Sequence, residues 1–189
     1  FGNPDFKPET SQSAELGISG NTANGRWSVD IFENRLDDVI AFVFAEGVSK
    51  NIDKANIRGV ELEFATEVAN WQVSANATLQ QAKQDAGANK GNRLARRAER
   101  VLNLNADRRF GAFSFGATIR AEGDRYDDAN NTKHLGGFTT VDLRGKYQFA
   151  KDWALAAKIG NLLDKEYETV DSYNQDGING LITLEYQPK

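Results

Sequence analysis

Charged side chains gather in two short stretches of this 189-residue chain. Arginine dominates "RLARRAER" (Arg93 to Arg100), and carboxylates cluster in "GDRYDD" at Asp124, Asp127 and Asp128. Arginines can bind nucleic-acid phosphates, but the chain carries a net charge of −4 and the run has no interleaved aromatic residues, so we expect no nucleic-acid partner. Clustered carboxylates can ligate calcium. We instead expect an acidic loop tip, and arginines that lie at a solvated strand top or pair with loop carboxylates.

Residues that could perform catalysis are isolated along the chain. His134 is the only histidine and there is no cysteine, so neither a catalytic triad nor a zinc site can be assembled. Glu61 and Glu63 could serve as an acid–base pair, yet their spacing places them on one face of a strand, where they would line a wet wall. No phosphate-binding loop or dinucleotide fingerprint is present. We therefore expect no enzyme, no metal site and no cofactor.

The elements that position these residues are predicted to be strands. Apolar and polar residues alternate with period two along the chain, as in "RWSVDIF" (Arg26 to Phe32) and "WQVSANATL" (Trp71 to Leu79), and helical spacing is not sustained. The same alternation appears in further segments: AELGISG, GVELEFATEV, RVLNLNA, FSFGATIRA, TVDLRGKYQF, WALAAKI and LITLEY. The count is about nine strands of a length that crosses a bilayer when tilted. The longest apolar run, Val39 to Ala45, is too short for a membrane helix.

The predicted connections alternate between short and long. Short turns are expected near 21–25, 69–70, 108–112 and 150–152, and long loops near 37–56, 80–91, 122–137 and 163–179. Aromatic residues lie at strand ends beside the short turns, at Trp27, Trp71, Phe110, Phe149, Trp153 and Tyr186. Short turns on one side, long loops on the other and an aromatic girdle are typical of an outer-membrane β-barrel. A soluble lipocalin-like barrel is the alternative, because alternation alone does not say which face is dry.

The two faces can be assigned under the membrane hypothesis. One set of alternating residues is expected to face lipid: Val73, Phe115, Ile119, Leu143, Leu155 and Leu184. The opposite set is expected to face the lumen: Thr118, Asp142, Arg144 and Lys146. An odd number of strands would place the chain ends on opposite sides of the membrane and leave unpaired edges, so we expect these strands to be part of a larger barrel.

Three stretches resemble landmarks of one family. "FGNPDFKPETS" (Phe1 to Ser11), "ANIRGVELE" (Ala55 to Glu63) and "GNLLDKEYE" (Gly160 to Glu168) are similar, in order and spacing, to segments of TonB-dependent outer-membrane transporters. The resemblance implies a 22-strand antiparallel barrel occluded by an N-terminal plug, in the bacterial outer membrane. Residues 1–189 would be the C-terminal portion of that barrel, with the plug and the earlier strands absent. Its partners would be outer-membrane lipid, the missing strands and plug of the same transporter, and TonB acting through the plug.

Within the family, "RRAERV", "GDRYDD" and "DKEYETVDSY" resemble stretches of the cobalamin transporters. The resemblance implies cobalamin as the ligand, and a ferric-siderophore transporter is the alternative within the same class. A passive small porin is an alternative from a different class. The loop after Tyr126, "DDANNTKHLGG", is poorer in aromatic residues than its cobalamin-transporter counterpart. By this resemblance the ligand-binding residues are Tyr173, Arg96, Arg97 and Tyr126. Strict alternation from Leu102 and Leu104 turns Arg97 inward, whereas the "RRA" similarity favours Arg96, so a bulge near the strand top is expected.

Overall fold

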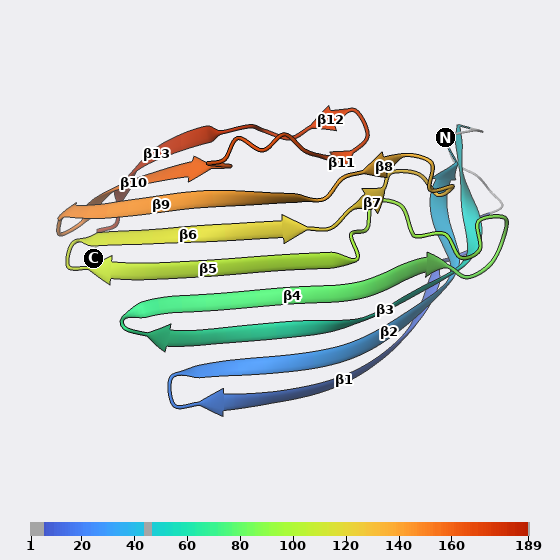
Figure 1. Ribbon diagram of the computed structural model, residues 1–189, viewed down its shortest axis with the longest axis horizontal. Coiled ribbons are helices and arrows are strands. Elements are labelled where there is room, and N and C mark those ends of the chain that lie inside the picture. Colours follow the sequence, from blue (N-terminus) through green and yellow to red (C-terminus); the bar gives the residue numbers. More distant parts are fainter. Residues whose placement is uncertain (1–5, 44–46, 189) are drawn as a thin grey trace.

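The computed structural model describes residues 6–43 and 47–188, which form one large antiparallel sheet and two small two-stranded ribbons (Figure 1). The nine strands of the sheet pair in the order β1-β2-β3-β4-β5-β6-β9-β10-β13, so every strand lies beside its neighbour in the chain apart from two small ribbons in the loops. The strands of the sheet are β1 (Thr10–Thr22), β2 (Gly25–Val43), β3 (Val48–Val68), β4 (Trp71–Gln84), β5 (Arg100–Phe110), β6 (Phe113–Glu122), β9 (Phe138–Ala150), β10 (Trp153–Gly160) and β13 (Asn179–Tyr186). The ribbons are β7 (Arg125–Tyr126) with β8 (His134–Leu135), and β11 (Glu168–Val170) with β12 (Tyr173–Asn174).

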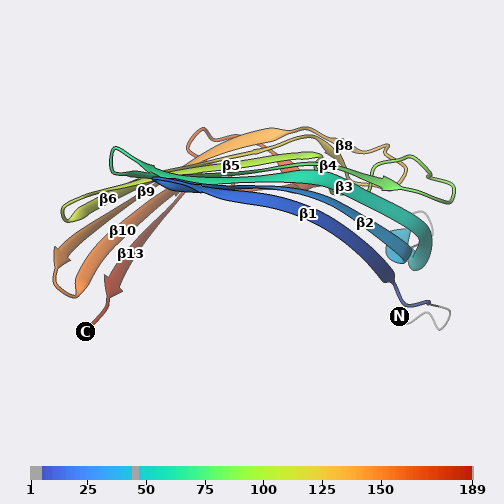
Figure 2. The same ribbon diagram turned by 90° about the horizontal axis from the view of Figure 1, so that it is seen from below.

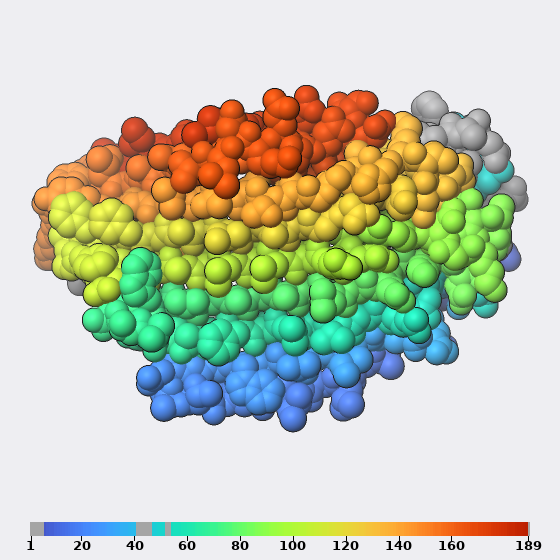
Figure 3. All heavy atoms as spheres, viewed as in Figure 1, coloured from blue at the N-terminus to red at the C-terminus, as the bar shows by residue number. Residues whose placement is uncertain are grey.

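The sheet is one twisted layer. Seen along the row of strands, successive strands are rotated relative to one another, which is the ordinary twist of β-structure (Figure 2). In the space-filling view the strands from β1 to β6 form side-by-side bands, and across the middle of the sheet no other segment lies over them (Figure 3). In the part of the chain that the structure describes, no helix has the length and apolar character needed to cross a membrane.

Short turns and long loops lie at opposite ends of the sheet (Figure 1). The turn end holds two-residue connections at 23–24, 69–70, 111–112 and 151–152, as the strand bounds show. Ala69 and Asn70 both adopt positive φ, 50° and 62°, which is the backbone of a type I′ turn and matches the twist of the flanking strands. The predicted alternation of connections is therefore confirmed, with nine strands in the main sheet.

Two of the predicted loop boundaries are wrong. The stretch 37–56, expected to be a loop, is mostly strand: β2 continues to Val43 and β3 begins at Val48. The ladder between them is interrupted at Asp38, which has a φ of 54°, and resumes with Val39 paired to Ile52. The loop expected at 80–91 instead occupies 85–99, because β4 continues to Gln84. The other two loops, 123–137 and 161–178, lie where they were expected and carry the small ribbons.

One face of the sheet is apolar across its whole width. Register joins Val73, Ala106, Ala117, Leu143 and Ile159 into a row that crosses five strands. This face is open: Leu16 is 76% exposed on β1 and Leu184 is 60% exposed on β13. An exposed apolar surface of this extent requires a partner phase or partner chain. All six residues expected to face lipid share this face.

The opposite face is polar and internally bonded. Arg144 donates from Nη1 to Thr118 Oγ1 at 2.6 Å and from Nε to Asp107 Oδ1 at 2.8 Å. Lys158 Nζ lies 2.8 Å from Asp142 Oδ2, and Lys146 pairs with a carboxylate of the last strand. The residues expected to face the lumen, Thr118, Asp142, Arg144 and Lys146, thus share one face, as predicted.

Aromatic side chains collect at the turn end of the apolar face. Phe113 stacks on Tyr147 with ring centroids 4.4 Å apart, and Trp153 packs on Tyr186 at 4.6 Å. Between the rings, the Arg108 guanidinium lies 4.4 Å from the centroid of Phe110. Amphipathic rings and a long cationic side chain at a band edge are characteristic of a membrane–water interface.

The polarity of both faces reverses near the loop end. On the apolar face Ile31, Val60 and Leu79 form a register row, and the next positions outward on the same strands are Glu33, Arg58 and Gln81. On the opposite face the strands become apolar at the same height. There Ala55, Ile57 and Ala82 are buried together with Leu94 from the 85–99 loop, and Phe32, Leu36 and Val39 pack against them. This small cluster is where the loops attach to the sheet.

The two faces can be told apart by one matched pair of substitutions. Ala75 lies mid-strand on the apolar face between Phe64 and Leu104, whereas Ser74 lies on the polar face between Ala65 and Asn105. In the intact protein Ala75→Lys is expected to reduce the free energy of unfolding by about 2–4 kcal/mol, because a charge would enter hydrocarbon. Ser74→Lys is expected to cost much less. Urea unfolding in lipid vesicles, followed by tryptophan fluorescence, measures both, and an equal or larger loss for Ser74→Lys would contradict the assignment of faces.

Candidate ligand-binding site at the loop end

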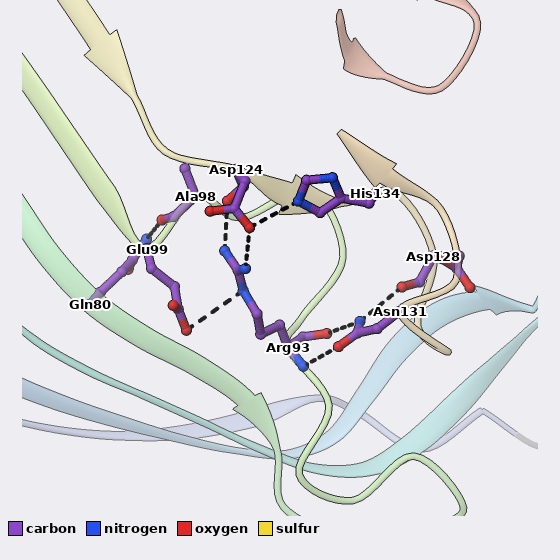
Figure 4. A network of polar contacts seen from close by, with 8 residues as sticks. All are labelled: Gln80, Arg93, Ala98, Glu99, Asp124, Asp128, Asn131 and His134. Atoms are coloured by element: carbon purple, nitrogen blue, oxygen red, sulfur yellow. Dashed lines mark hydrogen bonds and ion pairs between the residues drawn. The ribbon is translucent and has the colours of Figure 1, made fainter. Parts of the chain in front are cut away.

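Arg93 organises the polar contacts of the loop end (Figure 4). Its side chain is only 17% exposed, and it donates from Nη1 to Asp124 Oδ2 at 2.8 Å and from Nη2 to the Asp124 carbonyl at 2.6 Å. Its Nε lies 3.6 Å from Glu99 Oε1, and its Cζ lies 5.5 Å from the centroid of the Tyr126 ring. A planar guanidinium with fixed donors suits this combination of paired oxygens and a ring face. Arg93 thereby holds the 85–99 loop against the 123–137 loop.

Main-chain and amide contacts reinforce the same junction. The Arg93 N–H donates to Asn131 Oδ1 at 2.8 Å, and Asn131 Nδ2 donates back to the Arg93 carbonyl at 2.9 Å. Asn131 has a φ of 58°, a conformation that asparagine adopts more readily than most residues. Gln84 and Asn92 both donate side-chain amides to the Ala129 carbonyl, at 2.9 and 3.1 Å. The two loops therefore behave as one bonded unit.

A second arginine closes the junction from the other side. Arg96 Nε donates to Asp127 Oδ1 at 2.6 Å, and the Asp127 side chain is only 6% exposed. The Arg96 N–H donates to the Tyr126 carbonyl at 2.6 Å. Arg96 is held at a φ of 61°. The expectation that arginines of this run pair with loop carboxylates is confirmed by Arg93 and Arg96.

The three carboxylates of "GDRYDD" are each satisfied by the protein. The hydrogen bond from Arg93 holds the pKa of Asp124 below its usual range, against burial and with help from His134, whose Nε2 is 3.2 Å from Oδ2. Burial favours a raised pKa for Asp128, but the N–H groups of Lys133 and Thr132 and the Thr132 hydroxyl outweigh it and lower the pKa. Within residues 6–43 and 47–188, no group of three or more metal-ligating side chains is assembled.

The 161–178 loop is shaped by the residues of the "GNLLDKEYE" stretch. Asn161 is buried, has a φ of 47°, and donates from Nδ2 to the carbonyls of Lys165 and Asp176 at 2.9 and 3.1 Å. Asp164 Oδ1 accepts the Ile178 N–H at 2.8 Å. These two short polar side chains fold the chain back on itself where β10 ends. The side-chain hydrogen bonds of both residues stay within this loop, so the sequence motif itself predicts the geometry of the loop.

This third loop joins the other two. Lys133 Nζ lies 2.6 Å from Asp171 Oδ2, and Asp171 raises the pKa of the Lys133 ammonium. The ring of Tyr167 stacks on Phe138, at the start of β9, with centroids 3.9 Å apart. Loops 85–99, 123–137 and 161–178 thus form a continuous layer, which we call the loop layer.

The four residues expected to contact ligand all lie in the loop layer but differ in availability. Tyr173 is 68% exposed on β12, and Arg97 is exposed and makes no polar contact with the described residues. Arg96 is engaged by Asp127, and Tyr126 packs edge-on against His134 at 5.5 Å. The expected bulge is wrong: Arg96 and Arg97 precede β5, which begins at Arg100, so strand alternation does not govern them.

The sequence did not single out Arg93, Asn131 or Asn161, which hold the layer together. Arg93 was visible only as one member of an arginine run. Asn131 and Asn161 are short amides in turn-rich segments, which is the available signal for their positive φ.

Comparison with known proteins gives consistent results. Residues 1–162 match the family model "TonB dependent receptor-like, beta-barrel". The vitamin B12 transporter BtuB of Vibrio vulnificus is 33% identical over 98% of this chain and 31% of its own length. The corresponding protein of Photobacterium profundum is 31% identical over 92% of this chain and 29% of its own length. The chain therefore spans less than a third of the curated relatives that it matches.

Solved structures show the same fold. The ferric yersiniabactin uptake receptor FyuA from Yersinia pestis aligns with a TM-score of 0.77 and 22% identity, over 93% of this chain and 28% of that one. The copper transporter OprC aligns with a TM-score of 0.80 and 19% identity, over 96% of this chain and 32% of that one. The strands are thus arranged as in these receptor barrels, and the lipocalin-like alternative is not supported.

Replacing Arg93 tests the junction between the loops. Arg93→Gln removes charge-assisted hydrogen bonds that typically contribute about 1.5–3 kcal/mol each. In the intact protein we expect faster amide hydrogen exchange throughout 85–99 and 123–137, without change in the strands. Arg97→Gln is the matched control, because it removes an exposed arginine of the same run. Equal exchange in the two variants would contradict the role of Arg93.

Acid should open the same junction. The pKa of Asp124 is lower in the folded protein than its ordinary value of 3.8. The contribution of the Asp124 carboxylate to the stability of the junction is therefore complete above pH 3.8 and is lost as the pH falls through the lower folded pKa. Spin labels on Lys90→Cys and Asn130→Cys, in a chain without native cysteine, should report a narrow distance distribution at pH 6 that broadens below pH ~3.8. With Asp124→Asn the distribution should already be broad at pH 6. A narrow, pH-independent distribution in both proteins would remove Asp124 from the junction.

Proposed function

Because the chain belongs to the family of TonB-dependent receptors, we propose that residues 1–189 form the C-terminal part of the barrel of a bacterial outer-membrane receptor that actively imports a large ligand, cobalamin by preference. The observation that carries this proposal is the similarity of the chain to vitamin B12 transporters over nearly its whole length. The loop layer supports the proposal, because it forms a hydrogen-bonded platform at one end of a sheet with an apolar face. In this proposal the protein is a transporter and has no enzymatic role.

The proposed ligand contacts are Tyr173 and Arg97, supported from behind by Arg96 and Tyr126. A largely exposed tyrosine offers a flat apolar face and one hydroxyl at low entropic cost, which suits a large amphipathic ligand. Arg97 is exposed and has no polar partner among the described residues, so it offers a forked donor for a phosphate or a carboxamide oxygen. Arg96 contributes through Asp127 and the Tyr126 carbonyl, which fix the backbone from which Arg97 extends.

The two edge strands and the polar face of the sheet indicate the remaining partners, which are further segments of the same receptor. Strands β1 and β13 end the sheet, and unpaired backbone groups in hydrocarbon cost several kcal/mol each, so we propose that further strands of the same receptor close the barrel. On the polar face Asp30 stands opposite Glu61 in register, and like charges opposite one another are unfavourable. We propose that a plug covers this face and receives energy from TonB, as the family resemblance implies.

A ferric-siderophore receptor is the second candidate. The segment from Asp127 to Gly137 contains no aromatic residue, and several receptors of similar fold take up iron chelates, among them the ferric yersiniabactin receptor. A siderophore would use the same arginine chemistry for its anionic groups.

Ligand binding separates these candidates. In the full-length receptor, Tyr173→Ala and Arg97→Ala are each expected to weaken binding of cyanocobalamin by roughly tenfold, the loss from one good aromatic or charged contact. Lys90→Ala, an exposed loop cation elsewhere in the layer, is the control and should not change the affinity. Equilibrium binding of labelled cyanocobalamin to outer membranes measures all three.

Unchanged affinity in both variants, with the barrel intact, would remove these residues from the site. Absence of cyanocobalamin binding by the unmodified receptor, with saturable binding of a ferric siderophore, would favour the second candidate.

A further inference from the structure

A pocket lies between the polar face of the sheet and the 161–178 loop. Its wall follows one row of the register, in which Arg120 of β6 stands between Asn103 of β5 and Thr140 of β9. Tyr167 and Asp176 line it from the loop. Its volume is about 510 Å³, which is within the range of pockets that hold small molecules. The pocket is separate from the ligand contacts proposed above, because none of them lines it.

The loop that covers the pocket is fixed by hydrogen bonds. The Asn161 N–H donates to Asp142 Oδ1 on the wall at 2.9 Å, and Asn161 Nδ2 donates to the Asp176 carbonyl at 3.1 Å. The Gln175 N–H donates to the Tyr167 carbonyl at 3.0 Å. These bonds set the height of the loop above the wall, so the pocket is pre-formed.

Thr140 is almost fully buried in the wall of this pocket. It is 8% exposed, and its hydroxyl makes no hydrogen bond with residues 6–43 or 47–188. A threonine hydroxyl offers one donor and two acceptor lone pairs, and a buried polar group without a partner is unfavourable. The Tyr167 hydroxyl and the Asp176 carboxylate likewise have no partner in the described part of the chain. Three groups around one pocket are therefore available to a ligand.

The charges around the pocket favour a neutral ligand. Lys158 Nζ lies 2.8 Å from Asp142 Oδ2, and Arg120 donates from Nε to Glu122 Oε1 at 2.6 Å, so both cations of the lining are already compensated. A phosphate or carboxylate would therefore find no free cation, and it would lie near the unpaired Asp176 carboxylate. A cationic ligand would lie beside Lys158 and Arg120. A neutral ligand whose groups both donate and accept hydrogen bonds matches this lining.

We propose that this pocket binds the ring of a neutral sugar, either free or carried by a larger ligand. Ring hydroxyls would exchange hydrogen bonds with the hydroxyls of Thr140 and Tyr167 and would donate to the Asp176 carboxylate. The Asn174 side chain, which also lines the pocket, adds an amide donor and acceptor. A sugar fits because each of its hydroxyls both donates and accepts. The inference depends on the wall and the 161–178 loop and is independent of the proposed transport function.

The test uses the full-length receptor in a detergent without a sugar headgroup, titrated with glucose, galactose, mannose and ribose and followed by saturation-transfer NMR. At least one of these sugars is expected to bind saturably. Thr140→Val should weaken that binding by about three- to tenfold, the loss of one hydrogen bond. It should not lower the stability of the receptor, because the Thr140 hydroxyl has no bond with the described residues to lose.

Thr139→Val is the matched control. Thr139 is exposed on the opposite face of β9 and pairs with Ala121, so this variant removes the same hydroxyl from the neighbouring position outside the pocket. It should change the affinity for the sugar by less than about twofold, since no contact with the ligand is lost. Absence of saturable binding by all four sugars, or an equal loss of affinity in Thr139→Val and Thr140→Val, would overturn the proposal.

Cyanocobalamin, added to the same preparations, distinguishes the two sources of the sugar ring. Displacement of the bound sugar, with weaker cyanocobalamin binding in Thr140→Val, would assign the pocket to a ring carried by the imported ligand. Simultaneous binding of both would assign it to a free sugar. Arg97→Ala, which tests the proposed cobalamin contact, should leave sugar binding unchanged. Absence of cyanocobalamin binding together with Thr140-dependent sugar binding would contradict the proposed imported ligand and support the pocket, so the two failures are distinguishable.

Discussion

Register is the constraint on which the rest of this structure depends. Because side chains alternate strictly along a strand, a slip of one residue between two strands would exchange the apolar and polar faces. The two-residue turns are too short to allow such a slip, and the type I′ geometry at Ala69 and Asn70 fixes the register of the hairpin formed by β3 and β4. Once register is set, the apolar wall, the polar face and the common height of the loops all follow.

Register also explains which features could be predicted from the sequence. The alternation of apolar and polar residues in segments such as Trp71 to Leu79 predicts the number of strands and the two faces of the sheet. The lengths of the connections between these segments then predict at which end the turns and the loops lie. The strand that continues beyond Asp37 was not predicted, because charged residues such as Asp37 and Lys54 lie on the outer wall above the apolar band, where strands turn their polar side outward. A loop and a strand of reversed polarity have similar compositions, so composition could not separate them.

The loop layer was less predictable for a different reason. Arg93 and Asp124 are 31 positions apart in sequence, and their pairing exists only because β5 and β6 bring the two loops to the same height. Sequence reasoning identified the class of interaction, arginine with loop carboxylate, but not which arginine would be buried. Asn161 and Asp164 are the opposite case, since their bonds stay within one loop and the motif predicts them locally. Contacts within a segment are encoded by spacing, whereas contacts between loops require the sheet.

The apolar wall also has a thickness. On β4 it runs from Trp71 to Leu79, eight residue steps, which at about 3.3 Å per step is roughly 26 Å along the strand and close to 20 Å along the normal at the tilt of such barrels. That span is shorter than the hydrocarbon core of an average bilayer. The resulting hydrophobic mismatch would be relieved where lipids are thin, and it would favour lateral sorting of the protein toward thinner membrane. In the proposed membrane location, the position of Gln81, one alternation beyond Leu79, would set the depth of immersion and with it the height at which the loops meet the surrounding water.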